Sequence, residues 1–262
     1  MPVPARLEKS LNTNTPWLFL SPHLDDAVLS CAALMDSYAA RRDISVATLF
    51  TEAELPPHTR ATRAFLGQCS GDDAFALFED RRSEDRIVLA ELGVSHRHLG
   101  ASDALFRQRR RLKAALGPLG RALPELFHLY PTYRFDIALG RISRADRSLI
   151  ERLRNNVSQL VDQTEADLLF CPVGVGRHVD HLITRLVGSE FPEKVVYYSD
   201  FPYNQFADPE SAFLQKHQLV AWNWDVDPVR KHHHISQYAS QAPALFPDGD
   251  IPIAHETYFA AL

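Results

Sequence analysis

The sequence predicts an α/β fold in which a mostly parallel sheet carries helices on both faces. Short apolar runs rich in β-branched residues alternate with longer stretches of helical spacing along most of the chain. The joints between them are short, which favours right-handed parallel crossovers. The 262 residues are enough for one large domain with a substantial core. We therefore expect a Rossmann-like architecture with an active site at the carboxyl ends of the strands.

The first half of the chain supplies three of the expected strands and two helices. The strands lie at about 17–21, 44–50 and 94–100, where apolar and β-branched side chains follow one another. The helices lie at about 26–41 and 74–92. The second of them is amphipathic, as is typical of a helix that packs on a sheet.

The second half of the chain continues the alternation. A helix is expected from Ser143 to Gln163, and a buried strand follows at 167–172. Another helix begins near Leu182, and a further strand lies at 194–199. A late helix, from 227 to 240, completes the set of predicted elements.

Two segments do not fit this alternation. Residues 1–15 have few apolar positions and are expected to form a loosely ordered tail. Residues 101–142 make an unusually long connection, which predicts an insertion near the active site. Its basic run, 107–113, would either bind an anionic substrate or form a solvated helix face. Residues 1–262 are together expected to form a single domain.

The composition is that of an ordinary globular protein, with 45% hydrophobic and 23% charged residues. A formal charge of -5 argues against a general affinity for nucleic acid or for an anionic membrane. No apolar stretch is long enough to cross a bilayer, and the amino terminus lacks the apolar core of a signal peptide, so a cytoplasmic location is expected. Cys31, Cys69 and Cys171 are far apart and odd in number, which predicts reduced thiols.

Ligating and titrating side chains gather in two loops, each of which follows an expected strand and opens a helix. The first loop holds His23, Asp25 and Asp26, and the second holds His178 and His181. They converge if both loops lie at the carboxyl edge of neighbouring strands. Two imidazoles and one carboxylate, with a position open for water, form a catalytic zinc site or a mononuclear iron(II) site. One of the two adjacent aspartates can then bind metal while the other reaches the water.

A simpler interpretation exists for each loop taken alone. Asp25 and Asp26 before an apolar helix are typical of a helix N-cap, where negative charge is favourable. His178 and His181 could similarly be a cap and an exposed histidine. Their joint occurrence at two equivalent strand exits favours the metal site, because a cap does not require histidine in both places.

The first loop, Pro22–Asp26, resembles the Pro/Ala-His-Pro-Asp-Asp motif of the LmbE-like, or PIG-L-type, zinc-dependent N-deacetylases. The second, His178–His181, is similar to the His-Pro-Asp-His motif of the same family. Weaker similarity covers most of the chain from about Trp17 onward. Some members of the family carry a tyrosine two residues before the second motif, thought to polarise the substrate carbonyl, and this chain has Gly176 there.

The resemblance implies roles for the residues that match the two motifs. One Zn²⁺ per chain would bind to His23, Asp26 and His181, and other divalent metals such as Fe²⁺ would suit the same ligands. Asp25 would be the general base. His178 would stabilise the oxyanion or donate a proton.

Two further residues are implied to support the site. Asp180 would contact one of the ligating histidines and orient it without binding the metal itself. Arg81 would reach a sugar hydroxyl or a phosphate of the substrate; alternatively, it forms a surface ion pair with Glu84 or Asp85.

The activity implied by the resemblance is that of a metal-dependent hydrolase, which removes an acetyl or other small acyl group from the nitrogen of an amino sugar or its conjugate. The expected partner is therefore a small N-acylated amino sugar or glycoconjugate, without nucleic acid or membrane, and a homo-oligomer is left open. Two alternatives remain: a mononuclear iron(II) enzyme built on the same ligands, and a relative that binds without catalysis. The sequence does not fix the amine or the acyl group.

Overall fold

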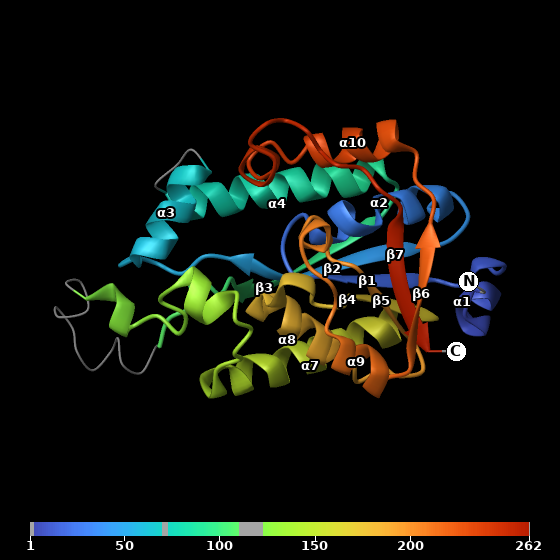
Figure 1. The fold of residues 1–262 in the computed structure, drawn as a ribbon, viewed down its shortest axis with the longest axis horizontal. Helices are drawn as coiled ribbons and strands as arrows, with labels where there is room; N and C mark the ends of the chain where they lie inside the picture. The colour runs from blue at the N-terminus through green and yellow to red at the C-terminus, as the bar shows by residue number, and fades with distance from the viewer. Residues whose placement is uncertain (1–2, 70–72, 110–122, 262) are drawn as a thin grey trace.

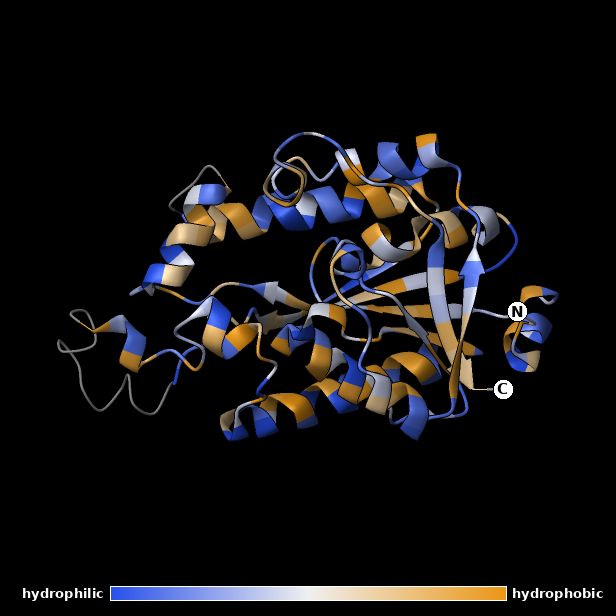
Figure 2. Cartoon of the chain, viewed as in Figure 1, coloured by the Kyte–Doolittle hydropathy of each residue, from blue (hydrophilic) through white to orange (hydrophobic). Residues whose placement is uncertain are grey.

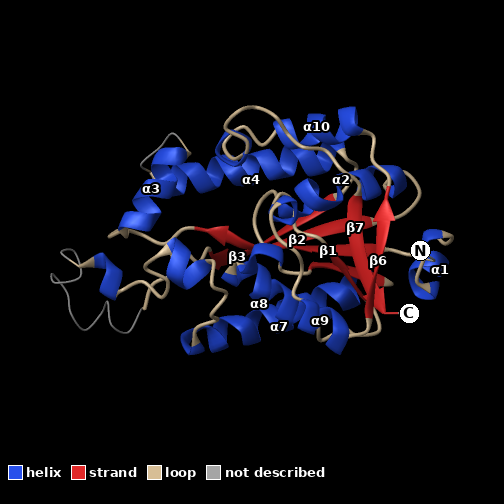
Figure 3. Cartoon of the chain, in the orientation of Figure 1, coloured by secondary structure: helices blue, strands red, loops and turns tan. Residues whose placement is uncertain are grey.

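The computed structural model describes residues 3–69, 73–109 and 123–261 of the chain (Figure 1). Seven strands form one sheet in the order β3-β2-β1-β4-β5-β7-β6 (Figure 3). The strands are β1 Trp17–Ser21, β2 Ile44–Glu52, β3 Ser95–Ser102, β4 Leu168–Pro172, β5 Val195–Tyr198, β6 Leu219–Trp224 and β7 Glu256–Ala261. The first five are mutually parallel, which confirms the predicted α/β class with a mostly parallel sheet.

Helices cover both faces of this sheet, as predicted. On one face lie α2 Asp26–Tyr38, α4 Ala74–Glu91 and α10 Pro228–Ser236, and on the other lie α7 Arg147–Thr164, α8 Val179–Gly188 and α9 Ser211–Lys216 (Figure 1). The remaining α-helices are α1 Ala5–Leu11, α3 Arg60–Gln68 and α11 Ala242–Leu245. Short 3₁₀ or π turns occur at Pro124–Leu126, Tyr133–Ile137, Arg144–Asp146, Val175–Arg177 and Tyr203–Gln205.

The alternation of side chains along β1 builds two core layers. Leu18 and Leu20 pack toward α7 and α8, whereas Trp17 and Phe19 pack toward α2. Phe19 stacks on Phe170 of β4, with ring centroids 4.2 Å apart. Figure 2 shows hydrophobic residues along the central strands and helices of mixed hydropathy.

The strand order places a topological switch point between β1 and β4. The chain runs from β1 to β2 and β3 on one side and then returns to place β4 on the other side of β1. The connections leaving β1 and β4 therefore diverge, and the space between their carboxyl ends is where open α/β sheets bind ligands. The two histidine-bearing loops are these connections.

Several details differ from the sequence predictions. β6 and β7 form an antiparallel edge that was not predicted. Within the expected loose tail, residues Ala5–Leu11 form α1, because Leu7 packs into the core and Ser10 accepts a hydrogen bond from the Trp17 indole N–H. The late helix α10 ends at Ser236 instead of 240, and the chain then turns toward the switch point.

Two other predictions concern cysteines and membranes. All three cysteines are free thiols, which confirms that prediction. Within the described ranges, the chain contains no helix with both the length and the apolar character required to cross a bilayer.

Candidate active site

The first loop is shaped by Ser21 and by Asp26, whose Oδ2 atom accepts the backbone N–H of His23 at 2.8 Å. The Ser21 hydroxyl donates to the carbonyl of His23 (2.6 Å) and accepts from the backbone N–H of Ala27 (3.0 Å), so it holds the loop against the start of α2. Asp25 stands at the N-cap position, but its side chain makes no capping hydrogen bond. The interpretation of this carboxylate as a helix cap is therefore wrong, and its side chain lines a cavity instead.

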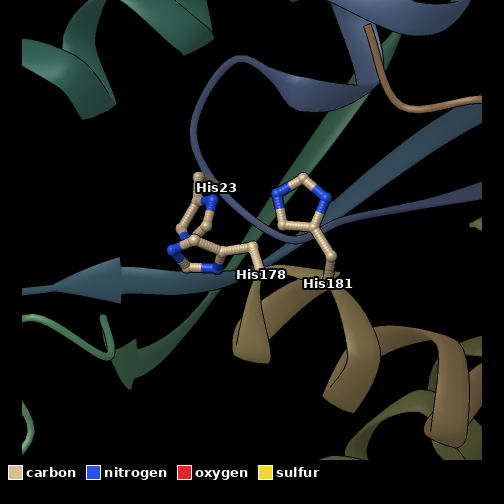
Figure 4. Close-up of side chains that lie close together, drawn as sticks. All are labelled: His23, His178 and His181. Carbon is tan, nitrogen blue, oxygen red and sulfur yellow. The ribbon is translucent and has the colours of Figure 1, made fainter. Parts of the chain in front are cut away.

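The second loop positions its two histidines differently from each other. His181 lies in the first turn of α8, whereas His178 precedes the helix, so the two side chains do not share a helix face. The Nδ1 atom of His178 accepts the backbone N–H of Asp180 at 3.3 Å, which is a capping contact. Both rings nonetheless turn toward His23, with centroids 5.0 and 5.3 Å from its ring (Figure 4).

Asp26 lies at the centre of the converging groups. Its Oδ2 atom is 3.0 Å from Nδ1 of His23 and 3.3 Å from Nε2 of His181. That Nε2 atom is buried and, apart from this 3.3 Å approach to Asp26, has no polar partner among the described residues. One ring nitrogen from each of His23, His178 and His181 lies within 4.8 Å of the others. Buried imidazole nitrogens that converge on one carboxylate oxygen form an arrangement that could hold a metal ion.

Carboxylates behind the histidines set which ring nitrogens face this centre. Nδ1 of His181 lies 2.6 Å from Oδ1 of Asp200, and Nε2 of His23 lies 3.3 Å from Oδ2 of Asp180. A proton held at each of these contacts leaves the opposite nitrogen free to ligate. Asp180 therefore contacts a candidate ligand, as the resemblance implied, whereas Asp200 was not predicted.

The charge balance of the centre also suits a cation. Burial lowers the pKa of His23, but its contacts with Asp180 and Asp26 outweigh this effect and raise the pKa to about 10. Burial also opposes the charged form of His181, yet Asp26 and Asp200 raise its pKa well above the ordinary value. These shifts favour the positively charged form of both imidazoles in a metal-free site, because the surrounding carboxylates attract positive charge. A divalent ion bound there would interact favourably with the same carboxylates.

The pKa values of the catalytic candidates Asp25 and His178 are shifted in the direction that favours the neutral form of each side chain. Burial, followed by the neighbouring charge of Asp26, raises the pKa of Asp25 to about 7. Burial and the nearby His23 lower the pKa of His178 well below its ordinary value, so this imidazole is neutral. The alternative in which His178 acts as a protonated acid is not favoured by this environment.

These groups open into a cavity of about 460 Å³. Its polar lining includes Asp25, Asp103 and Arg81, and its apolar wall includes Phe65 of α3 and Leu245 of α11. The carboxylate of Asp103 comes within 3.5 Å of His23 Nε2. Asp103 lies in the segment predicted to be an insertion near the active site. A cavity of this size, with a few polar groups on one side, suits a small organic ligand.

Arg81 is buried in the cavity wall and is not paired on the helix surface. Its guanidinium donates to the side-chain carbonyl of Gln241, while Glu84 and Asp85 are engaged elsewhere. The alternative of a surface ion pair is therefore wrong. Within the described part of the chain, Nε of Arg81 is buried without a partner, so this side chain retains hydrogen-bonding capacity beside the cavity. Gln241 also donates to the carbonyl of Leu24 and so ties Arg81 to the first loop.

The basic run 107–113 has a structural role at its start. Arg107 is buried, donates to Asp146 at 2.8 Å and pairs closely with Asp180. It is thus neither an anion site nor a solvated helix face, because its charge neutralises two buried carboxylates. Residues 110–113 lie outside the described residues.

Gly176 marks another departure from the expectation based on the family. Its φ of +75° and its surroundings leave no room for a side chain, since a Cβ would come within 2.9 Å of Cδ1 of Tyr203. The Tyr203 ring thus fills the space above Gly176, packs edge-on to His181 and lines the cavity. A tyrosine at position 176 would require Tyr203 to move.

The residues that sequence reasoning missed follow the same topological rule as those it found. Asp200 comes shortly after β5 and Asp103 directly after β3, so both lie at the carboxyl edge of parallel strands. Their position after a strand in the sequence could therefore have identified them as candidate site residues. Gln241 had no such signal, because it reaches the site through the turn after α10.

Fold and site together define a class of protein: an α/β protein with a candidate two-histidine, one-carboxylate metal centre at the switch point of its sheet. The model of one family, PIG-L, described as GlcNAc-PI de-N-acetylase, matches residues 18–191. The chain belongs to the PIG-L family, as the resemblance of its two motifs indicated.

Several proteins similar to this chain are named as deacetylases. A 2'-N-acetylparomamine deacetylase of Niallia circulans is 28% identical over 249 residues, which cover 88% of this chain and 82% of that protein. A solved deacetylase–teicoplanin complex has a TM-score of 0.68 and 26% identity, covering 94% of this chain and 97% of that one. The zinc-inhibited form of a teicoplanin deacetylase has a TM-score of 0.69 with the same coverage, and at 24% identity it supports the shared fold.

Proposed function

We propose that this chain is a zinc-dependent N-deacetylase that removes an acetyl or other small acyl group from the nitrogen of an amino sugar or amino-sugar conjugate. The relatives that carry an assigned activity support the reaction class. The observation that carries the metal assignment is the convergence of two imidazole nitrogens on Asp26 Oδ2: the buried Nε2 of His181 lies 3.3 Å from that oxygen, and Nδ1 of His23 lies 3.0 Å from it. In this proposal His23, Asp26 and His181 hold the ion.

A bound zinc ion lowers the pKa of a water molecule to near neutral and polarises the acyl carbonyl. Asp25 does not ligate the ion and accepts the proton of the attacking water, because it lines the cavity next to Asp26 and its raised pKa suits proton transfer near neutral pH. The same carboxyl group then returns the proton to the departing amine.

His178 supplies a neutral hydrogen bond to the developing oxyanion. Because its Nδ1 accepts the Asp180 N–H, the ring proton of the neutral imidazole is on Nε2. A donor fixed in this way stabilises negative charge on the carbonyl oxygen without having to reorient during the reaction.

Arg81 and the aromatic residues bind the rest of the substrate. The free hydrogen-bonding capacity of Arg81 suits a sugar hydroxyl, and Gln241 holds the guanidinium in place. Tyr133 and Tyr203 line the cavity on the side of His178 and can contact a sugar ring. By contrast, Tyr130 is buried and donates to Asp146, so it belongs to the core.

The experiment that tests the proposal is a panel of N-acetylated amino sugars and aminoglycosides, incubated with the zinc-loaded protein and read by mass spectrometry. The expected result is the loss of one acetyl group from at least one member, with release of free acetate. The matched control is Asp25→Asn, which keeps the size of the side chain and should release acetate at least about 10²-fold more slowly. Absence of amine release from the whole panel by fully zinc-loaded protein would favour a binding relative without catalysis.

A further inference from the structure

A second cluster of possible ligands lies between α4 and α10, away from the cavity. Glu91 is the last residue of α4, and its Oε1 atom lies 2.8 Å from Nε2 of His233 on α10. Its other oxygen accepts the amide N–H of Gln237 at 2.6 Å. His234, the next residue on α10, completes a group in which one ligand atom from each of Glu91, His233 and His234 lies within 4.8 Å of the others.

His234 provides a second, independent observation. Its side chain is buried, with 4% of the residue exposed, and within the described ranges neither ring nitrogen has a hydrogen-bond partner. Leaving a buried polar group unpaired is destabilising, so native structures rarely tolerate it. A ligand that accepts the imidazole lone pair would satisfy one of these two nitrogens.

The donor set selects the kind of ligand. Two imidazole nitrogens and one carboxylate oxygen suit zinc and neighbouring transition-metal ions better than magnesium or calcium, which prefer oxygen. Ligand atoms on one tetrahedral zinc ion lie about 3.4 Å apart, given bonds of about 2.0–2.1 Å. The Glu91–His233 contact of 2.8 Å is shorter than that spacing, and the His234 atom lies within 4.8 Å of both partners, so binding an ion requires these side chains to adjust around it.

We propose that Glu91, His233 and His234 form a second transition-metal site, separate from the centre at His23, Asp26 and His181. The ion fastens the end of α4 to α10. The same two segments meet again near the cavity, where Tyr238 donates to Asp85 and Gln241 accepts from Arg81. Metal at the second site therefore stabilises the helix pair that positions Arg81.

The test uses zinc alone as the probe and removes the first site with His181→Ala. After metal stripping, incubation with zinc and dialysis, elemental analysis should find one ion in this variant. Adding Glu91→Gln or His234→Ala to the same background should abolish that ion. The matched control is His232→Ala in the same background, because His232 is an exposed neighbour outside the cluster, and it should keep the ion.

The design separates misfolding from loss of a ligand. Glu91 is exposed, so Glu91→Gln should leave the circular dichroism spectrum unchanged while removing the ion. Zinc should also raise the melting temperature of the His181→Ala protein but not that of the double variants. The proposal is overturned if His181→Ala binds no zinc, or if its remaining ion survives both Glu91→Gln and His234→Ala.

Discussion

His181 Nδ1 lies 2.6 Å from Asp200 Oδ1, and this contact leaves Nε2 as the ring nitrogen that is available to a metal ion. The other oxygen of Asp200 accepts the backbone N–H groups of Gly174 and Val175, both at 2.8 Å, and so ties the second loop to the end of β5. The Asp200 carboxylate thus holds the second loop in place and also orients His181, the candidate metal ligand that follows this loop.

Replacing Asp200 by asparagine should weaken metal binding without removing a ligand. The amide no longer favours a proton on Nδ1 of His181, so zinc affinity should fall about 10–100-fold. Competition with a chromophoric chelator measures the change. Asp208→Asn, an exposed substitution on the same connection, is the control and should bind zinc as the unaltered chain does. Equal affinity in both variants would show that Asp200 does not orient His181.

The substitution Asp25→Asn should separate metal binding from catalysis. We expect the variant to retain zinc and to lose about 10²–10⁴-fold in kcat, because the base is absent while the ligands are intact. Elemental analysis and the deacetylation rate give the two readouts. A variant that keeps its rate between about pH 5 and about pH 9 would contradict the assignment of the base.

The same substitution should change how stability depends on pH. A carboxyl group whose folded-state pKa is raised favours folding below its unfolded-state value and loses that contribution as pH rises through the folded-state value, here about 7. Metal-free protein should therefore lose stability relative to Asp25→Asn between about pH 5 and about pH 8, by on the order of 1–3 kcal/mol. Urea unfolding of both proteins at the two pH values measures the difference. Parallel pH profiles would contradict the raised pKa.

Replacing Arg81 by methionine should act on substrate binding. Loss of a hydrogen bond from a charged group costs about 1.5–3 kcal/mol, so KM should rise about 10-fold or more with a smaller change in kcat. Steady-state kinetics on the substrate found in the panel give both constants. Arg86→Met is the matched control on the same helix, since Arg86 forms a 3.7 Å ion pair with Glu79 and is not among the described residues that line the cavity. A KM change common to both variants would show a general charge effect.

Removing the Tyr203 hydroxyl tests whether this residue does more than fill space above Gly176. If its phenol contacts the reacting carbonyl, Tyr203→Phe should lower kcat about 10–100-fold while leaving zinc content and folding unchanged. Tyr133→Phe is the comparison, because Tyr133 also lines the cavity but lies against His178 instead of His181. Equal, small effects of both substitutions would limit Tyr203 to packing.

Much of this arrangement could be predicted from sequence because it depends on local pattern. The strand β1 and the loops with His23 and His178 are short-range signals, and the edge rule for parallel sheets brings them together. The antiparallel edge strands β6 and β7 could not be inferred in this way, since their pairing depends on long-range contacts. Likewise, Arg107 looked like part of a basic surface run, and only the tertiary structure reveals the two carboxylates it neutralises.

The most direct measurement is the dependence of deacetylation on the metal at His23, Asp26 and His181. Protein stripped by a chelator should release no acetate from its N-acetylated substrate, and zinc should restore the rate in proportion to the ion bound. His181→Ala treated in the same way should remain inactive at every zinc concentration, even if it retains an ion elsewhere. A stripped protein, or a His181→Ala variant, that deacetylates at the full rate would contradict a metal-dependent reaction at this site.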